Sequence, residues 1–172
     1  MPPRDGAKSA ALLELERRMD EAESYEAWLA LAAKHDSETG ADEWRRTESS
    51  SSYDHAEVAI RLRRLEEALA AGDAHEVLYS LNEGVHGNMG GMGRPLLYAR
   101  AKCGTKKLIE RYVATLVQAL DFVLCAPTSV VPFAEKRDFF RRASHCYGRS
   151  ALLLSGGAGL IYFHHGVVDA LV

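Results

Sequence analysis

Hydrophobic side chains recur every three or four residues along most of this chain, and that period predicts amphipathic helices. Residues 11–36 predict one or two such helices. Ser24 can cap the second, because its hydroxyl can accept an amide proton left free in the first turn. Residues 56–71 predict another helix, which Gly72 would end. The core-facing stripe of that helix is expected at Val58, Leu62, Leu65 and Leu69.

The strongest helical pattern covers residues 105–126 and stops before Pro127, since proline cannot continue a helix. Shorter helices are predicted for residues 75–84 and 133–148. One broad apolar face of the strongest helix is expected to hold Ile109, Tyr112, Val113, Leu116, Leu120 and Val123.

Two stretches predict loops. Residues 37–57 are polar and rich in serine and glycine, although Trp44 and Tyr53 imply that parts of this loop pack on the core. The glycine-rich loop Gly84–Gly93 is incompatible with a regular helix or a central strand. It is either a lipid-facing or substrate-gating loop or a simple turn between two helices.

The pattern changes near the end of the chain. Residues 151–154 form a continuous apolar run, which is typical of a strand buried on both faces of a parallel sheet. Three glycines follow between residues 156 and 159, and helical spacing returns from about residue 160 to 171. The sequence therefore predicts a strand, a glycine turn and a helix in this order.

Composition excludes several classes of protein. The 172 residues are 47% hydrophobic and 26% charged, with a formal net charge of -3, so the chain has no global attraction to nucleic acid. Its cysteines, Cys103, Cys125 and Cys146, form no C-x-x-C pair, which argues against a disulfide framework or a zinc knuckle and favours a reducing compartment. Neither a membrane-spanning window nor a secretory signal is present in the sequence, so membrane contact is expected to be peripheral.

The predicted strand–glycine–helix turn presents free backbone amides and the positive end of a helix dipole at one point, which favours an anion. A P-loop is excluded because no lysine follows the glycines, and a dinucleotide-binding turn is excluded because Tyr162 stands where its third glycine would be. An oxyanion hole needs only glycines and amides. On local pattern alone, a purely structural turn remains an equal alternative.

Other candidate chemistry is weaker. His164 and His165 would point about 100° apart on a helix and so would not chelate one ion from one face. Adjacent His145 and Cys146 rarely face each other, which predicts a buried thiol. A basic cluster could meet anionic lipid headgroups or form ordinary solvated helix faces. Its members are Lys106, Lys107, Arg137, Arg141, Arg142 and Arg149.

The run Ser155–Ala158, followed by His164, Gly166, Val167 and Val168, resembles the opening of the patatin-like phospholipase domain. It is similar to the branch of fungal and plant triacylglycerol lipases, which reads approximately S-G-G-A-x-x-x-x-x-H-x-G-V-V. Upstream blocks such as "DEWRR" and "GVHGNMGGMGRPLLYAR" resemble, in order, the helical N-terminal region of that branch. The resemblance covers roughly residues 22–172.

The resemblance implies a cytoplasmic enzyme that acts at lipid droplets or membranes and hydrolyses acylglycerols, with phospholipase or acyltransferase side activity in some members. The amides of Gly157 and Ala158 would form the oxyanion hole, with Gly156 and Gly159 shaping the turn. This sequence departs from the family at Gly159, where a small polar residue is usual, and at Ile161, where a small residue is usual.

Patatin-like enzymes use a Ser-Asp dyad, with the serine in G-x-S-x-G and the aspartate in D-G-[GA]. Ser150 lacks the second glycine and precedes the predicted strand, whereas a nucleophile elbow follows one. The only Asp-Gly pair is Asp5-Gly6, in a terminus expected to be disordered. We therefore expect no catalytic residue in this chain, which looks truncated, and no lipase activity from it alone.

The sequence thus predicts a mainly α N-terminal accessory region that leads into the first strand, loop and helix of a patatin-like α/β domain. Residues 1–7 would be disordered, 8–148 the helical accessory domain, and 149–172 the start of the catalytic domain. We expect an acylglycerol or phospholipid substrate, a peripheral membrane or lipid-droplet location, and no cofactor, metal or nucleic acid. The alternative is a non-catalytic helical module that docks on lipid droplets or a partner. Acyl chain preference, headgroup and oligomeric state stay open.

Overall fold

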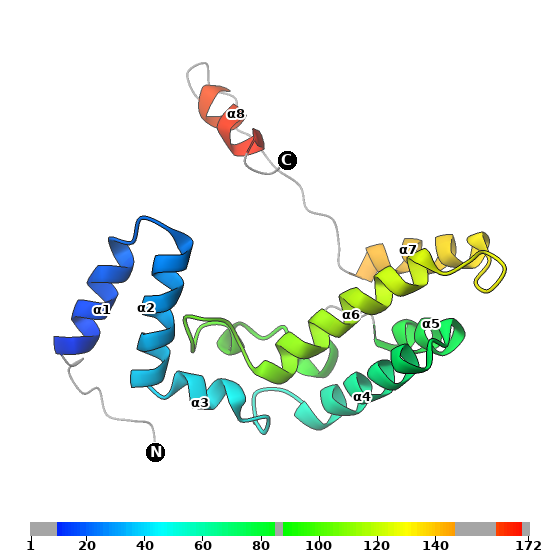
Figure 1. Ribbon diagram of the computed structural model, residues 1–172, viewed down its shortest axis with the longest axis horizontal. Coiled ribbons are helices and arrows are strands. Elements are labelled where there is room, and N and C mark those ends of the chain that lie inside the picture. Colours follow the sequence, from blue (N-terminus) through cyan, green and yellow to red (C-terminus); the bar gives the residue numbers. More distant parts are fainter. Residues whose placement is uncertain (1–9, 85–87, 147–160, 170–172) are drawn as a thin grey trace.

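A computed structural model describes residues 10–84, 88–146 and 161–169, and those residues are mainly helical (Figure 1). Within these ranges the regular elements are α-helices and two short 3-10 turns, and none is a strand. The mainly α character expected for the accessory region is therefore confirmed. The strand expected at residues 151–154 and the disordered terminus expected at residues 1–7 lie outside the described residues.

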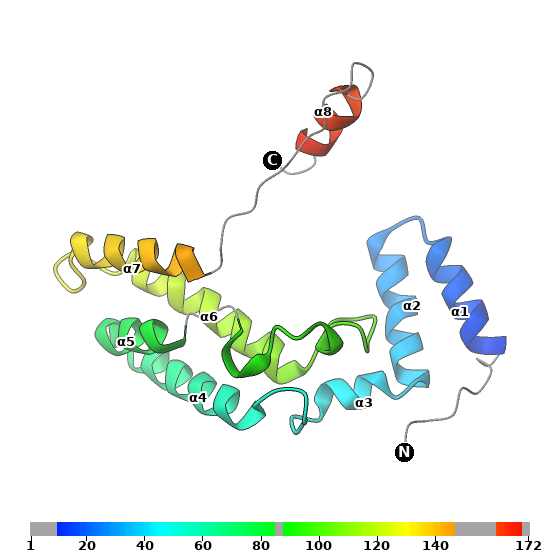
Figure 2. The ribbon, with the colours of Figure 1, turned by 180° about the vertical axis from the view of Figure 1, so that it is seen from behind.

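The first two helices form a hairpin. α1 (Ala10–Asp20) and α2 (Tyr25–Glu38) lie side by side in both ribbon views (Figures 1 and 2). The Oγ of Ser24 accepts a hydrogen bond from the amide of Ala27 at 3.2 Å, which confirms the predicted cap. Of the one or two helices predicted for residues 11–36, the structure shows two.

A third helix occupies a segment that was expected to be a loop. α3 (Ala41–Arg46) lies within residues 37–57, so the loop prediction is wrong there. Gly40 turns the chain with a φ of 70°, and the helix then has acidic residues in its first turn and arginines in its last, which complements its dipole. Trp44 is half-buried against the core and Tyr53 is buried, as expected.

The central bundle contains α4 (His55–Ala71), α5 (Ala74–Gly84) and α6 (Lys107–Cys125), which pack against one another. Asp54 caps α4, and Gly72 ends it with a φ of 67°, as the sequence predicted. The buried residues of α4 are Val58, Leu62, Leu65 and Ala68, while Leu69 is half-buried.

Helix α6 supplies much of the core. Four of the six residues expected on its broad apolar face, Ile109, Tyr112, Leu116 and Val123, are buried. Val113, also on that face, is 45% exposed. The apolar arc of α6 is wider than the surface that α4 and α5 cover, and Val113 lies on the uncovered side of it.

The segment before α6 closes one side of the bundle through two 3-10 turns, η1 (Met89–Gly91) and η2 (Pro95–Leu97). Its buried side chains are Met89, Met92 and Leu97. Gly90 has a φ of 59°, and a Cβ there would lie 3.1 Å from Val58 Cγ2 and 3.2 Å from Asp54 O. The amide of Asp54 donates to Gly90 O at 2.7 Å. The described part of loop Gly84–Gly93 therefore packs against α4, which favours the connecting turn over a gate.

The last two helices complete the described chain. α7 (Phe133–Cys146) contacts the end of α6, where Lys136 Nζ donates to the carbonyls of Leu124 and Ala126. Cys146 is exposed, so the predicted buried thiol is wrong; α7 turns only one narrow face toward the core. The helix expected from about residue 160 to 171 is present as α8 (Ile161–Asp169).

Candidate functional site

The predicted oxyanion residues Gly156, Gly157, Ala158 and Gly159 lie outside the described residues, as do Ser150 and Arg149. The geometry of that site therefore stays a prediction. The described polar chemistry lies in three places: on α8, which follows the predicted loop, at the contact between α3 and the segment that enters α6, and in a cavity between α4 and α5.

On α8, His165 and Asp169 lie one turn apart, and His165 Nδ1 is 2.9 Å from Asp169 Oδ2. Phe163 and His164 contact each other edge to face, with ring centroids 6.2 Å apart. The two histidines thus have different neighbours. Within the described ranges, no cluster of three His, Cys, Asp or Glu side chains could hold a metal ion.

Lys106 was predicted to belong to an exposed basic cluster, and this is wrong, because it is only 1% exposed. Its Nζ donates to Trp44 O at 2.8 Å and to Thr47 O at 2.6 Å, and it lies 4.6 Å from the centre of the Trp44 ring. Burial, and to a lesser degree the charge of Arg100, lowers the pKa of Lys106. The amine therefore satisfies carbonyls at the end of α3 rather than facing a lipid.

Asp36 on α2 is also 1% exposed. Its two carboxylate oxygens accept hydrogen bonds from the amides of Lys102, at 2.8 Å, and Cys103, at 2.9 Å. Burial acts to raise the pKa of Asp36, but the hydrogen bonds from Lys102 and Cys103 outweigh it, so the pKa lies below its usual value. This carboxylate ties α2 to the segment that precedes α6.

Arg45 and Glu110 form a third tie between these elements. Arg45 donates to Glu110 Oε1 at 2.8 Å and to Thr105 O at 3.1 Å, while the amide of Thr105 donates to Glu110 Oε1 at 3.1 Å. Burial opposes ionisation of Glu110, but hydrogen bonds from Lys107 and Arg45 leave its pKa below the usual value. We refer to Asp36, Arg45, Lys106 and Glu110 as the anchor cluster.

The anchor cluster is built for holding segments together. Each polar side chain in it already has hydrogen-bond partners on a neighbouring element. A catalytic site would instead pair a nucleophile with a base. The sequence did not reveal the roles of Asp36 and Lys106. Nothing in the residue type distinguishes a buried charged side chain from an exposed one, and the partners of both residues lie far away in the chain.

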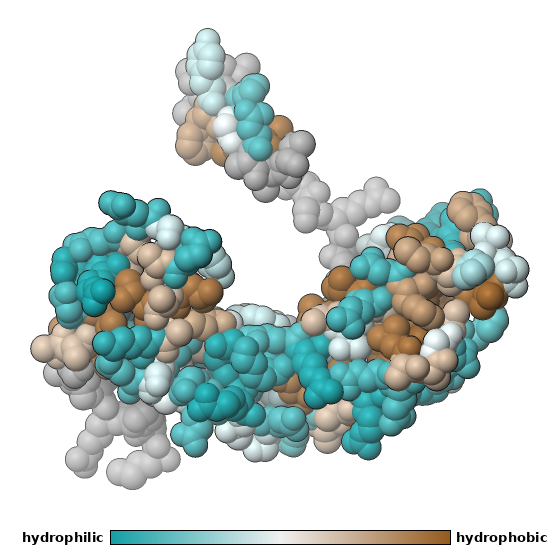
Figure 3. Space-filling view, in the orientation of Figure 1, coloured by the Kyte–Doolittle hydropathy of each residue, from teal (hydrophilic) through white to brown (hydrophobic). Residues whose placement is uncertain are grey.

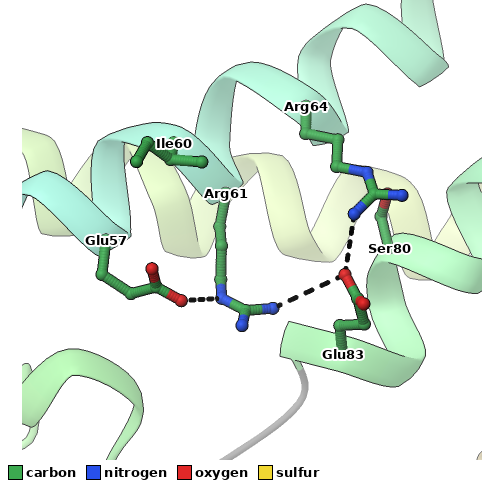
Figure 4. Close-up of a pocket in the computed structure, with 6 residues that line it drawn as sticks. All are labelled: Glu57, Ile60, Arg61, Arg64, Ser80 and Glu83. Atoms are coloured by element: carbon green, nitrogen blue, oxygen red, sulfur yellow. Dashed lines mark hydrogen bonds and ion pairs between the residues drawn. The ribbon is translucent and has the colours of Figure 1, made fainter.

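A small surface cavity of about 160 Å³ lies between α4 and α5 (Figure 4). Arg61 bonds to Glu57 at 2.6 Å, and Arg64 bonds to Glu83 at 2.8 Å. Because carboxylates neutralise both arginines, the cavity does not select an anion. Ser80 also lines it, and its Oγ is buried without a hydrogen-bond partner among the described residues. The carboxylates of Glu57 and Glu83 in the lining pair with the arginines, so we assign no catalysis to the hydroxyl.

The rest of the predicted basic cluster does not form one surface. Lys107 pairs with Glu110 at 2.7 Å, and Arg142 bonds to Asp138 at 3.0 Å and to Asn82 at 3.1 Å. Arg137 and Arg141 are exposed on α7. These contacts favour ordinary solvated helix faces over a lipid headgroup site. None of the described helices is long and apolar enough to span a bilayer.

Comparison with known proteins identifies the helical region. The family described as "Domain of unknown function (DUF3336)" matches residues 7–145. This chain belongs to the DUF3336 family. The DUF3336 match covers α1 to α6 and nearly all of α7, and α8 lies beyond it. No solved structure matches the chain.

Curated proteins similar to this DUF3336 chain are named as patatin-like phospholipase domain proteins or as a triacylglycerol lipase. A patatin-like phospholipase domain-containing protein of Cryptococcus neoformans is 35% identical over 158 residues, which cover 92% of this chain and 18% of that protein. One from Yarrowia lipolytica is 36% identical over 152 residues, 88% of this chain and 18% of its own length. Triacylglycerol lipase ptl2 of Schizosaccharomyces pombe is 35% identical over 158 residues, 92% of this chain and 25% of the lipase.

These names confirm the resemblance to patatin-like proteins of the triacylglycerol lipase branch. The chain spans about a fifth to a quarter of the length of these relatives. The name of each relative therefore describes a protein several times longer than the part that matches.

Proposed function

We propose that this chain is the helical region and oxyanion-hole loop of a patatin-like triacylglycerol lipase, a serine acyl hydrolase of lipid degradation. The observation that carries this proposal is its 35% identity to triacylglycerol lipase ptl2 across 92% of the chain. The S-G-G-A motif at residues 155–158 lies inside that resemblance. The substrate would be an acylglycerol or a phospholipid, met at a lipid droplet or membrane by a cytoplasmic protein.

In this proposal the amides of Gly157 and Ala158 donate to the negative oxygen that forms when a serine attacks an ester. Gly156 and Gly159 let the backbone turn closely around that oxygen. These 172 residues contain no G-x-S-x-G motif, so they do not supply the nucleophile. Hydrolysis then requires a serine and an aspartate from outside residues 1–172.

The first experiment measures ester hydrolysis by the purified 172-residue chain, with a water-soluble ester and with emulsified triacylglycerol. We expect no turnover above that of buffer, because an oxyanion hole without a nucleophile stabilises a charge that never forms. Turnover that persists after Ser150→Ala and Ser155→Ala substitution would contradict the assignment of the missing nucleophile.

The second experiment tests the loop itself. Residues of this chain replace the matching region of triacylglycerol lipase ptl2, and the chimera is assayed for triacylglycerol hydrolysis. Ala158→Pro removes one amide donor, so kcat should fall about 10²- to 10³-fold. Ala158→Ser keeps the amide and is the control. Equal activity of the proline and serine variants would exclude this amide from the oxyanion hole.

The alternative function is a non-catalytic helical module that docks on lipid droplets or on a protein. It is supported by exposed apolar side chains on α6 and α7, among them Val117, Leu124 and Phe133. Flotation of the chain with triacylglycerol emulsions, combined with an inactive chimera, would favour this alternative. Flotation together with an active chimera would be compatible with the lipase.

A further inference from the structure

Helix α6 carries an apolar stripe that the bundle leaves open. Its four residues are spaced four, three and four positions apart, the spacing of a stripe that receives another helix. Val117 is 52% exposed and Leu124 is 58% exposed, whereas Leu120 is half-buried. We refer to Val113, Val117, Leu120 and Leu124 as the α6 seam.

The seam adjoins the core but is separate from it. α4 and α5 pack on the side of α6 that carries Tyr112, Leu116 and Val123, which are buried. Figure 3 shows hydrophobic residues gathered over the part of the molecule that α6 and α7 form, while the surface over α3 and the start of α4 is hydrophilic. An exposed apolar stripe of this kind marks an interaction site.

Helix α8 has a matching apolar face. Phe163 is 68% exposed, and Val167 follows it one turn later on the same side. His165 and Asp169 pair on the opposite side. In both ribbon views α8 stands apart from the other helices (Figures 1 and 2). Its nine residues are fewer than the roughly 12–15 that an isolated helix needs in water, so it requires a packing surface.

The chain connection allows the two faces to meet. α7 begins at Phe133 beside the end of α6 and runs back along it to Cys146, and residues 147–160 join it to α8 (Figure 1). A segment of that length spans at most roughly 50 Å, whereas α6 is about 28 Å long. Every position on the α6 seam is thus within reach of α8. The tether also gives α8 a high effective concentration at the seam.

Polar side chains border both apolar faces. Asp121 lies one turn from both Val117 and Leu124, so its carboxylate borders the α6 seam. His164 lies beside Phe163 and Val167 at the edge of the apolar face of α8. The contact would therefore have an apolar centre and a polar border.

We propose that α8 docks on the α6 seam of its own chain through the face that carries Phe163 and Val167. The seam is then the contact between the DUF3336 helices and the segment that resembles the opening of the patatin domain. A second copy of the chain or a lipid surface on the seam would be a different contact, and the experiment separates them. The inference does not depend on hydrolysis, because its readout needs no turnover.

The experiment is disulfide cross-linking in the 172-residue chain, with Cys103, Cys125 and Cys146 replaced by alanine. The test pair is Val117→Cys with Phe163→Cys. The matched control pair is Val117→Cys with His165→Cys, which moves the second cysteine to the opposite face of α8. Mild oxidation should close the test pair within one chain about tenfold faster than the control pair. Circular dichroism verifies the helical fold of each variant.

Three results would overturn the proposal. Equal rates for the two pairs would show random collision of a tethered segment, and disulfides between chains would show a second copy on the seam. Protection of the test pair from oxidation only when triacylglycerol emulsion is present would show a lipid surface there.

Hydrogen exchange provides a second measurement without new cysteines. Amides of residues 161–169 should exchange slowly in the original chain. They should exchange at least about tenfold faster after Val117→Asp, which places a charge in the seam. Gln118→Asp puts the same charge on an exposed position outside the seam, about 100° around α6 from Val117, and should leave the exchange unchanged. Equal exchange in all three proteins would also overturn the proposal.

Discussion

Folded proteins usually bury apolar side chains and expose charged ones, and the anchor cluster and the α6 seam each depart from this rule. The anchor cluster buries Asp36 and Lys106 to 1% exposure, while the seam leaves Val117 and Leu124 more than half exposed. The buried charges are stable because hydrogen bonds from neighbouring segments replace water. The exposed apolar side chains of the seam are not covered by any described helix of the bundle. At its start α6 is thus joined to neighbouring segments by the anchor cluster, while along the seam its apolar side chains remain exposed.

The largest effect should come from removing the carboxylate of the anchor cluster. Asp36→Ala leaves the partly buried amides of Lys102 and Cys103 without their acceptor, so we expect a loss of about 3 kcal/mol in the free energy of unfolding. Urea denaturation measures it. Asp20→Ala, at an exposed position of α1, is the control and should change stability by less than about 0.5 kcal/mol. Equal effects would show that Asp36 is not an anchor.

Acid should weaken the same contact without any substitution. The folded-state pKa of Asp36 lies below its unfolded value, so its contribution to stability is complete above the unfolded pKa of about 3.9. That contribution is lost as the pH falls through the folded-state pKa. The urea midpoint of the original chain should therefore fall more steeply below pH 4 than that of Asp36→Asn. Parallel curves would contradict the lowered pKa.

A smaller effect should follow from changing the shape of one cation. Arg45→Lys keeps the charge, but lysine lacks the planar fork of donors with which the guanidinium bonds to both Glu110 and the carbonyl of Thr105. We expect a loss of about 1 kcal/mol in the free energy of unfolding. Arg46→Lys is the matched control, because Arg46 pairs with Asp42 at the surface and should matter by less than about 0.5 kcal/mol.

The smallest effect on stability should occur at the seam. Val117→Ser alters a side chain that is 52% exposed, so the free energy of unfolding of the helical bundle should change by less than about 0.5 kcal/mol. Leu116→Ser, one position earlier in the core, should be strongly destabilising. If Val117→Ser destabilised the bundle as much as Leu116→Ser, the seam would already be part of the core.

Most of the fold could be predicted from the period of the apolar residues. This signal was reliable for α4 and α6, because each buries a stripe several turns long. It failed for α3, whose six residues are too few to show a period and whose Trp44 and Arg45 contact distant segments of the chain. It also could not show that Val113 is exposed, since a helix sequence gives the width of its apolar arc but not the number of neighbours that cover it.

The candidate sites were harder to predict for a different reason. The anchor cluster joins residues about sixty positions apart, and no local pattern marks the carbonyls that Lys106 satisfies. The oxyanion loop at Gly156–Gly159 was inferred from a motif and a family resemblance, and the relatives support the family without describing the loop. A motif can name the chemistry of a turn, but the direction of its amides depends on the strand and helix around it.

The Lys136 contact has a consequence for where the chain leaves the helical bundle. A single amine on α7 bonds to two carbonyls where α6 ends, so it joins the start of α7 to the end of α6. One lysine thereby helps to set the position from which residue 147 and those after it continue.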